Sequence, residues 1–342
     1  MISINRDLKI SNIKGLLIFL VVYSHFIELF KPHAYDIFLL MFAFHMPLFV
    51  FISGLLAKRA RIDKVVNFLL IYLIFQTIYL IGLPYIYGST MHFSIITPYY
   101  HMWYILSLSF WYLVAILVNK INLKTWQKIA FVIFLIIISA TSRLFTNEIV
   151  NFISTYKSGV TSFTLSFQRT LYFAPFFFIG FFLNKEWWDK IANSIKYRKI
   201  FSIISIALVV YVFQKVDKTH LDSLYRGSTG YEVHDYALFE IAFSYLSAIL
   251  LCYAVINLMS NKRNLLTHWG DRTLTIYLLH PFFMWILYKS VQNINVGAYY
   301  PKITILAYTF VICMLLSSKI VLKISEPIIN PLNTIKRIKN EV

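Results

Sequence analysis

The chain has 342 residues, of which 59% are hydrophobic and only 14% are charged. Soluble domains average about 45–50% apolar and about 25% charged residues, so this composition, with a mean hydropathy of +0.67, excludes a water-soluble fold. The formal net charge of +17 does not indicate nucleic-acid binding, because the Lys and Arg residues lie between apolar runs and form no single basic stripe.

Apolar stretches long enough, or nearly long enough, to cross a bilayer recur along the whole chain. A bilayer core of about 30 Å takes roughly 20 helical residues to cross. In chain order the stretches are 13–30, 37–57, 65–83, 101–119, 126–142, 170–184, 200–214, 236–259, 273–290 and 302–322. They predict an all-α integral membrane bundle of about ten transmembrane helices. We expect a single domain over 1–342, with no appended soluble domain and an uncleaved first span.

Basic residues cluster in alternate connections, which indicates the cytoplasmic side of a plasma-membrane or inner-membrane protein. These cations are Arg6, Lys9, Lys14, Lys58, Arg59, Arg61, Lys64, Lys120, Lys124, Lys128, Lys185, Lys190, Lys196, Arg198, Lys199, Lys262, Arg263, Arg272, Lys323, Lys336, Arg337 and Lys339. The loop 84–100 has no Lys or Arg, and the loop 215–235 mixes both signs of charge. The pattern predicts a multi-pass protein with both termini in the cytoplasm.

Four histidines fall within or at the edges of the predicted spans: His25, His45, His101 and His280. Ionisable groups at membrane depth are costly and need a reason to be there. Each histidine alone is also explained as a hydrogen-bonded packing or interfacial residue. All four together indicate a functional site. The two cysteines lie singly in apolar runs and predict neither a disulfide framework nor a metal site.

His25 is the best candidate for a catalytic base, because an imidazole changes its charge near pH 7 at little cost. Glu28, three residues later, is placed to orient or stabilise that ring, or it is an ordinary interfacial charge. Lys14 precedes His25 by eleven residues and returns to nearly the same helix face, about 16 Å lower. It suits a phosphate-bearing donor, and it equally suits a positive-inside anchor.

Five segments carry a resemblance to a known family. They are 14–25 (KGLLIFLVVYSH), 44–54 (FHMPLFVFISG), 101–108 (HMWYILSL), 169–180 (RTLYFAPFFFIG) and 276–280 (IYLLH). Because the five segments occur in the same order as similar motifs of that family, the chain resembles the acyltransferase 3 family of membrane O-acyltransferases, especially its fucose 4-O-acetylase-like branch. The first segment is similar to the family's Arg/Lys-x10-His signature.

The resemblance implies transfer of acetyl from cytoplasmic acetyl-CoA, without a metal, to a hydroxyl of a carbohydrate acceptor. The acceptor is usually a surface polysaccharide such as a capsule or exopolysaccharide. His25 would be the base or acyl relay, and Lys14 would help bind the donor. Arg169 is a lesser candidate for contacting donor or acceptor. The residues predicted to contact the substrate are His45, His101, Trp103, Tyr277 and His280.

The chain departs from the family pattern at the start of the third helix. Many relatives have Arg-x-x-Arg there, whereas this chain has KVVN at 64–67. Lys58, Arg59 and Arg61 lie a few residues earlier and are candidates for the CoA phosphates. An ordinary cytoplasmic loop explains these cations equally well.

Two other classes compete with the acyltransferase interpretation. A polysaccharide or lipid-linked sugar exporter also needs about ten spans with polar groups inside, and broken, repeated helices would favour it. A structural or sensory membrane protein would not explain four costly histidines. Spacing leaves open direct transfer or an acyl-histidine or acyl-serine intermediate; Ser24 and Ser53 are also explained as packing residues. It also leaves open the sugar, the hydroxyl, the acyl group and the oligomeric state.

Overall fold

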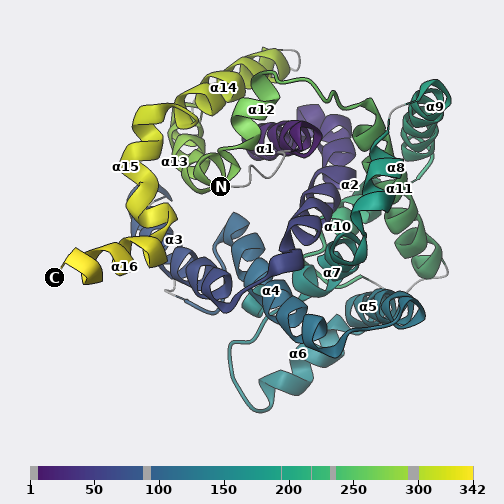
Figure 1. Ribbon diagram of the computed structural model, residues 1–342, viewed down its shortest axis with the longest axis horizontal. Coiled ribbons are helices and arrows are strands. Elements are labelled where there is room, and N and C mark those ends of the chain that lie inside the picture. Colours follow the sequence, from purple (N-terminus) through teal and green to yellow (C-terminus); the bar gives the residue numbers. More distant parts are fainter. Residues whose placement is uncertain are drawn as a thin grey trace. The chain divides into compact units, whose positions relative to one another are not determined.

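The computed structural model describes residues 7–87, 94–193, 195–216, 218–231, 236–291 and 300–341 (Figure 1). Within these ranges all regular structure is helical, which confirms the predicted all-α membrane fold. Parts of the predicted loops, including Arg6, 88–93, Asp217, Glu232 and Asp235, lie outside the described residues. The chain forms two compact units. Unit 1 comprises Met1–Ile52, Asn184–Lys218 and Ser244–Ser325, and unit 2 comprises Ser53–Leu183, Thr219–Phe243 and Glu326–Val342.

Helices correspond to all ten predicted apolar stretches. In the described part of the chain, seven helices are long and apolar enough to cross a membrane, and a bent pair with a 72° break makes an eighth candidate. The helix for stretch 170–184 has only 16 residues, and the helix for 200–214 begins with Lys196, Arg198 and Lys199. The predicted number of ten spans and the N-in/C-in orientation therefore stay predictions.

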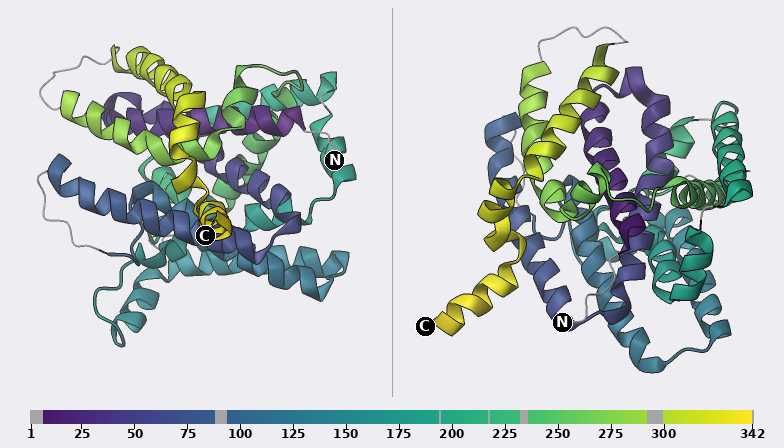
Figure 2. Two further views of the ribbon diagram at one scale, coloured as in Figure 1. Left: turned by 60° about the vertical axis from the view of Figure 1, so that its left-hand side comes forward. Right: turned by 45° about the horizontal axis from the view of Figure 1, so that its top comes forward.

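Unit 1 is built around α1 (Leu8–Glu28), which packs against α12, α13 and α14. Figure 2 shows α13 and α14 beside α1 in both views. The other helices of this unit, some of which continue past its boundaries, are α2 (Lys31–Leu56), α8 (Lys185–Ala192), α9 (Lys196–Phe213), α11 (Ala237–Leu258), α12 (Leu265–Gly270), α13 (Thr273–Val291), α14 (Tyr300–Leu316) and α15 (Lys319–Ile329).

The start of α1 is defined by a cap, and its packing on α12 is defined by two glycines. The Asp7 side chain accepts hydrogen bonds from the backbone N–H groups of Lys9 and Ile10, which would otherwise be unsatisfied. A Cβ at Gly15 would lie 1.9 Å from the Leu266 carbonyl oxygen, and one at Gly270 would lie 1.8 Å from that of Ser11. Only glycine lets the backbones of α1 and α12 approach this closely.

Unit 2 is a second helical bundle in which α3 packs on α4 and α7 packs on both α4 and α5. Its elements are η1 (Ala57–Arg59), α3 (Ile62–Tyr87), η2 (Tyr100–Met102), α4 (Trp103–Ile121), α5 (Thr125–Leu144), α6 (Thr146–Ser154), η3 (Thr164–Ser166), α7 (Phe167–Phe182), α10 (Lys218–Arg226) and α16 (Pro331–Glu341). A Cβ at Gly54 would lie 1.9 Å from the Phe177 carbonyl oxygen, so this unit also depends on a close helix contact.

The helix α5 presents one apolar face outward. Ile129, Ile133 and Ile137 are all more than half exposed, and only 17% of the most apolar 18-residue segment of this helix is buried. Contiguous exposed apolar surface of this kind is tolerated where lipid, and not water, is the solvent. The exposed face therefore supports the membrane-embedded fold.

Candidate active site

A pair of histidines lies in unit 1, where α1 and α13 meet. The Nδ1 atom of His25 lies 2.8 Å from the Nε2 atom of His280, and the two rings stack with centroids 5.0 Å apart. His25 is partly buried, whereas His280 is 0% exposed. The ring of His25 therefore points into the helical unit and meets another titratable ring, which chain spacing did not predict.

Aromatic side chains surround the histidine pair. The His280 ring centroid lies 6.5 Å from that of Phe26 and 6.1 Å from that of Tyr277, and Phe26 in turn contacts Tyr308. Tyr277 is thus near the site, as expected for a substrate-contacting residue, although its role stays a prediction. Glu28 follows His25 by one helical turn and is partly buried.

His45 lies elsewhere in unit 1, on α2, and is 1% exposed. Its Nδ1 atom lies 2.5 Å from the Met41 carbonyl oxygen of the preceding turn, and its ring meets Phe42 edge-on at 4.8 Å. The contact with Met41 gives the buried Nδ1 atom a hydrogen-bond partner. The predicted contact of His45 with substrate stays a prediction.

Lys14 lies on α1 next to Gly15, at the contact with α12, and is partly buried. The same contact is stabilised by Asn12, whose side-chain amide donates to the carbonyl oxygens of Ser260 and Lys262 at 2.8 and 2.9 Å. A segment with several cations is thereby held against the helix that carries Lys14. This arrangement is compatible with a donor that bears phosphates.

His268 lies on α12, close to the end of the unit that carries Lys14. Burial and the neighbouring Arg272 guanidinium, whose Nη1 atom lies 3.1 Å from His268 Nδ1, lower the pKa of His268 below its usual 6.5. Near pH 7 the positive charge at this end therefore comes from lysine and arginine and not from His268.

The other predicted cations belong to unit 2. Arg59 ends η1 and is exposed. Arg61 is also exposed and lies 3.6 Å from Asp63. Exposed ion pairs of this kind contribute little to stability. Their position at a helix start fits both a cytoplasmic loop and a phosphate contact, so their donor-binding role stays a prediction.

Arg169 bridges two backbone segments in unit 2. Its Nε and Nη1 atoms donate to the carbonyl oxygens of Arg226 and Tyr100 at 3.2 and 3.3 Å, and its guanidinium lies 5.2 Å from the ring centroid of Trp103. Trp103 is buried and stacks on Phe173. These contacts supply a structural reason for Arg169 and Trp103 besides the predicted contact with donor or substrate.

His101 is 2% exposed and lies among aromatic rings of the same unit. Its ring meets Tyr79 and Tyr99 edge-on, at 5.0 and 5.9 Å between centroids. The preceding residue, Tyr100, has a positive φ of 27°, a conformation that is strained for a non-glycine residue. Such strain is common at functional sites, so the predicted role of His101 stays open.

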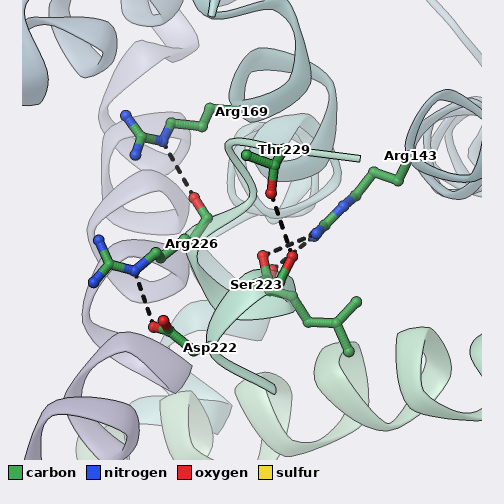
Figure 3. A network of polar contacts seen from close by, with 7 residues as sticks. Arg143, Arg169, Asp222, Ser223, Arg226 and Thr229 are labelled. Atoms are coloured by element: carbon green, nitrogen blue, oxygen red, sulfur yellow. Dashed lines mark hydrogen bonds and ion pairs between the residues drawn. The ribbon is translucent and has the colours of Figure 1, made fainter. Parts of the chain in front are cut away.

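Sequence reasoning missed Arg143, which is 1% exposed and belongs to α5. Its Nη1 and Nη2 atoms donate to the carbonyl oxygens of Leu224 and Ser223 at 2.8 and 2.9 Å. Figure 3 shows the guanidinium groups of Arg143 and Arg169 pointing to the last turn of α10. A cation placed just after an apolar stretch was the available signal, but the same signal also marks ordinary loop residues.

Within the described ranges, no three His, Cys, Asp or Glu side chains lie close enough together to hold a metal ion. Comparison with known families decides the class of protein. The family model for the acyltransferase domain of the acyltransferase 3 family matches residues 7–322. The chain belongs to the acyltransferase 3 family. It is therefore a multi-pass membrane acyltransferase, which confirms that class of enzyme. No curated protein and no solved structure gives a significant match.

Proposed function

We propose that this acyltransferase moves an acetyl group from cytoplasmic acetyl-CoA to a sugar hydroxyl of a surface polysaccharide. The observation that carries the proposal is the His25–His280 pair, at 2.8 Å, inside a helical unit of a membrane acyltransferase. An imidazole placed within a largely apolar membrane unit has a clear use in proton transfer, because it can accept and release a proton near pH 7.

In the proposed reaction His25 acts as the general base. The imidazole takes the proton of the acceptor hydroxyl while the hydroxyl oxygen attacks the acetyl carbonyl carbon, forming the C–O ester bond. The C–S bond of the thioester breaks, and the thiolate of CoA leaves and takes up the proton from the imidazolium. Atoms and charge balance without any additional reactant. General base assistance of this kind contributes about 10²–10⁴-fold to the rate.

Lys14 and Glu28 have supporting roles in the proposal. Both lie on α1 with His25, and Lys14 is in its N-terminal half, which is the predicted cytoplasmic side. A lysine there attracts the phosphates of CoA, while Glu28 stabilises the protonated form of His25 through its negative charge. Arg59, Arg61 and Arg169 remain proposed contacts for the donor, and His45, His101, Trp103 and Tyr277 for the acceptor.

One feature favours the rival class of polysaccharide or lipid-linked sugar exporters. The pair α14 and α15 is bent by 72° at a break of two residues, Ser317 and Ser318, and broken helices are common in transporters. An exporter would move the glycan without consuming acetyl-CoA, so release of CoA separates the two functions.

The test is an acetyl-transfer assay with purified protein in lipid nanodiscs. We expect free CoA thiol and ester-linked acetyl on the glycan when acetyl-CoA and a chemically deacetylated surface polysaccharide are both present. His25→Ala should lower the rate by about 10²–10⁴-fold. His220→Ala is the matched control, because His220 pairs with Glu240 at 3.5 Å in unit 2 and has no role in the proposed step. A wild type that releases no CoA and transfers no acetyl would refute the proposed function, and equal rates for His25→Ala and the wild type would refute the role of His25.

A further inference from the structure

The hydrogen bonds of His280 define which of its nitrogens carries a proton. Its Nδ1 atom lies 3.1 Å from the carbonyl oxygen of Ile276, and a carbonyl oxygen can only accept, so Nδ1 is the donor. A neutral imidazole has one donor and one acceptor nitrogen. The Nε2 atom of neutral His280 is therefore an acceptor.

The bond from His280 Nδ1 stays within α13, because Ile276 lies one helical turn before His280. The ring is thereby held from its Nδ1 side, with Nε2 directed at His25, 2.8 Å away.

The same reasoning then applies to His25. Because Nε2 of His280 accepts, Nδ1 of His25 must donate, and the neutral ring of His25 carries its lone pair on Nε2. When that lone pair takes a proton, the resulting imidazolium keeps its Nδ1–H bond to His280. The hydrogen bond from His25 to His280 is then linked through the His280 ring to the bond from His280 to Ile276. Hydrogen bonds linked in this way polarise and strengthen one another.

We propose that His280 is a positioning residue that holds His25 in the Nδ1-protonated tautomer, which makes Nε2 of His25 the nitrogen that receives the acceptor proton. This inference rests on the proposed function of His25 and replaces the earlier expectation that His280 contacts substrate. It differs from simple packing of two rings, because packing alone would not select one tautomer.

The direct test is ¹⁵N NMR of histidine-labelled protein in nanodiscs at neutral pH, which distinguishes protonated from unprotonated ring nitrogens. Signals of His25 are assigned by their loss in His25→Asn. We expect a protonated Nδ1 and an unprotonated Nε2 for His25 in the wild type. A wild-type His25 protonated on Nε2 alone, or a doubly protonated His280, overturns the proposal without any variant.

Variants of His280 then test whether His280 determines the tautomer of His25. His280→Leu removes the acceptor at similar volume, and the His25 signals should shift toward a mixture of tautomers. His280→Gln keeps an amide oxygen that can accept from Nδ1, and it should preserve the wild-type tautomer. His45→Leu is the control for this readout, since His45 is buried in the same unit and bonds the carbonyl of its own preceding turn. Unchanged His25 signals in His280→Leu overturn the proposal.

Activity provides a second readout. His280→Leu should lower kcat by about 10- to 100-fold, the range found when the group that orients a metal-ligating histidine is removed, and should leave KM for the glycan unchanged. His280→Gln should recover most of that loss. A rise in KM with unchanged kcat would show a substrate contact and overturn the positioning role.

The two proposals fail separately. If His25→Ala keeps full acetyl transfer while the tautomer depends on His280, the proposed role of His25 as general base fails and the hydrogen-bond assignment stands. If His25→Ala abolishes acetyl transfer while the tautomer of His25 in the wild type does not depend on His280, only the positioning role of His280 fails.

Discussion

Individual residues show how membrane burial constrains this chain. His45, His101 and His280 are each at most 2% exposed, yet their contacts differ. His45 and His280 bond backbone carbonyls of their own helices, whereas His101 is surrounded by tyrosine rings. His280 contacts a second histidine, His25, and the proposed chemistry is built on that pair.

Glycines at helix contacts give the sharpest prediction at the residue scale. Gly54→Ala places a methyl group 1.9 Å from the Phe177 carbonyl oxygen, and backbone atoms cannot move aside cheaply. We expect a loss of about 1–3 kcal/mol or more, seen as a lower thermal midpoint in detergent. Gly159→Ala is the control, because nothing lies within 4 Å of that Cβ and only its φ of +77° opposes the change. A midpoint for Gly54→Ala that is higher than for Gly159→Ala would contradict the close contact.

At the scale of elements, arginines connect the short helix α10 to unit 2. The last carbonyls of a helix have no partner within it, and cations bind them well because the helix dipole is negative at that end. Arg143 bonds the carbonyls of Ser223 and Leu224, and Arg169 bonds that of Arg226. The segment after stretch 200–214, predicted only as an outward loop, thus contains a helix anchored at its C-terminus.

Gln76 anchors another connection in a similar way. Its side-chain amide donates to the carbonyl oxygens of Ser94 and Thr97, and its oxygen accepts from the Tyr99 backbone N–H, all at 2.8–2.9 Å. This buried glutamine therefore holds the segment that leads into η2 and His101.

Removal of Arg143 should loosen α10 selectively. In Arg143→Met two charge-assisted hydrogen bonds are lost, and such bonds contribute about 1.5–3 kcal/mol each. We expect amide hydrogen exchange in α10 to accelerate by at least about tenfold. Arg143→Lys keeps the charge but lacks the planar fork that reaches two carbonyls, and it should give an intermediate rate. Arg337→Met is the control, because Arg337 is an exposed arginine of the same unit. If exchange in α10 stays at the wild-type rate in Arg143→Met, Arg143 does not anchor α10.

At the scale of the whole molecule, the apolar stretches and the distribution of cations predict which loops face the cytoplasm. Lys124, before α5, should face inward, and Tyr156, after α6 and 80% exposed, should face outward. Both positions are described in the structure, and neither is part of the proposed chemistry.

Cysteine labelling in intact cells tests that orientation. In a background lacking Cys252 and Cys313, Tyr156→Cys should react with a membrane-impermeant maleimide, and Lys124→Cys should react only after permeabilisation. Labelling of Lys124→Cys in intact cells would contradict the predicted N-in/C-in topology.

The sequence by itself determined that this is a helical membrane protein, which apolar stretches form helices, and that Lys14 and His25 share one helix. These properties are local, because span length and hydropathy depend only on consecutive residues. Only the tertiary structure brought His25 to His280, 255 residues apart, and Arg143 to α10. Partner choice between apolar helices depends on shape, small residues and interhelical hydrogen bonds, and these appear only when the helices are packed.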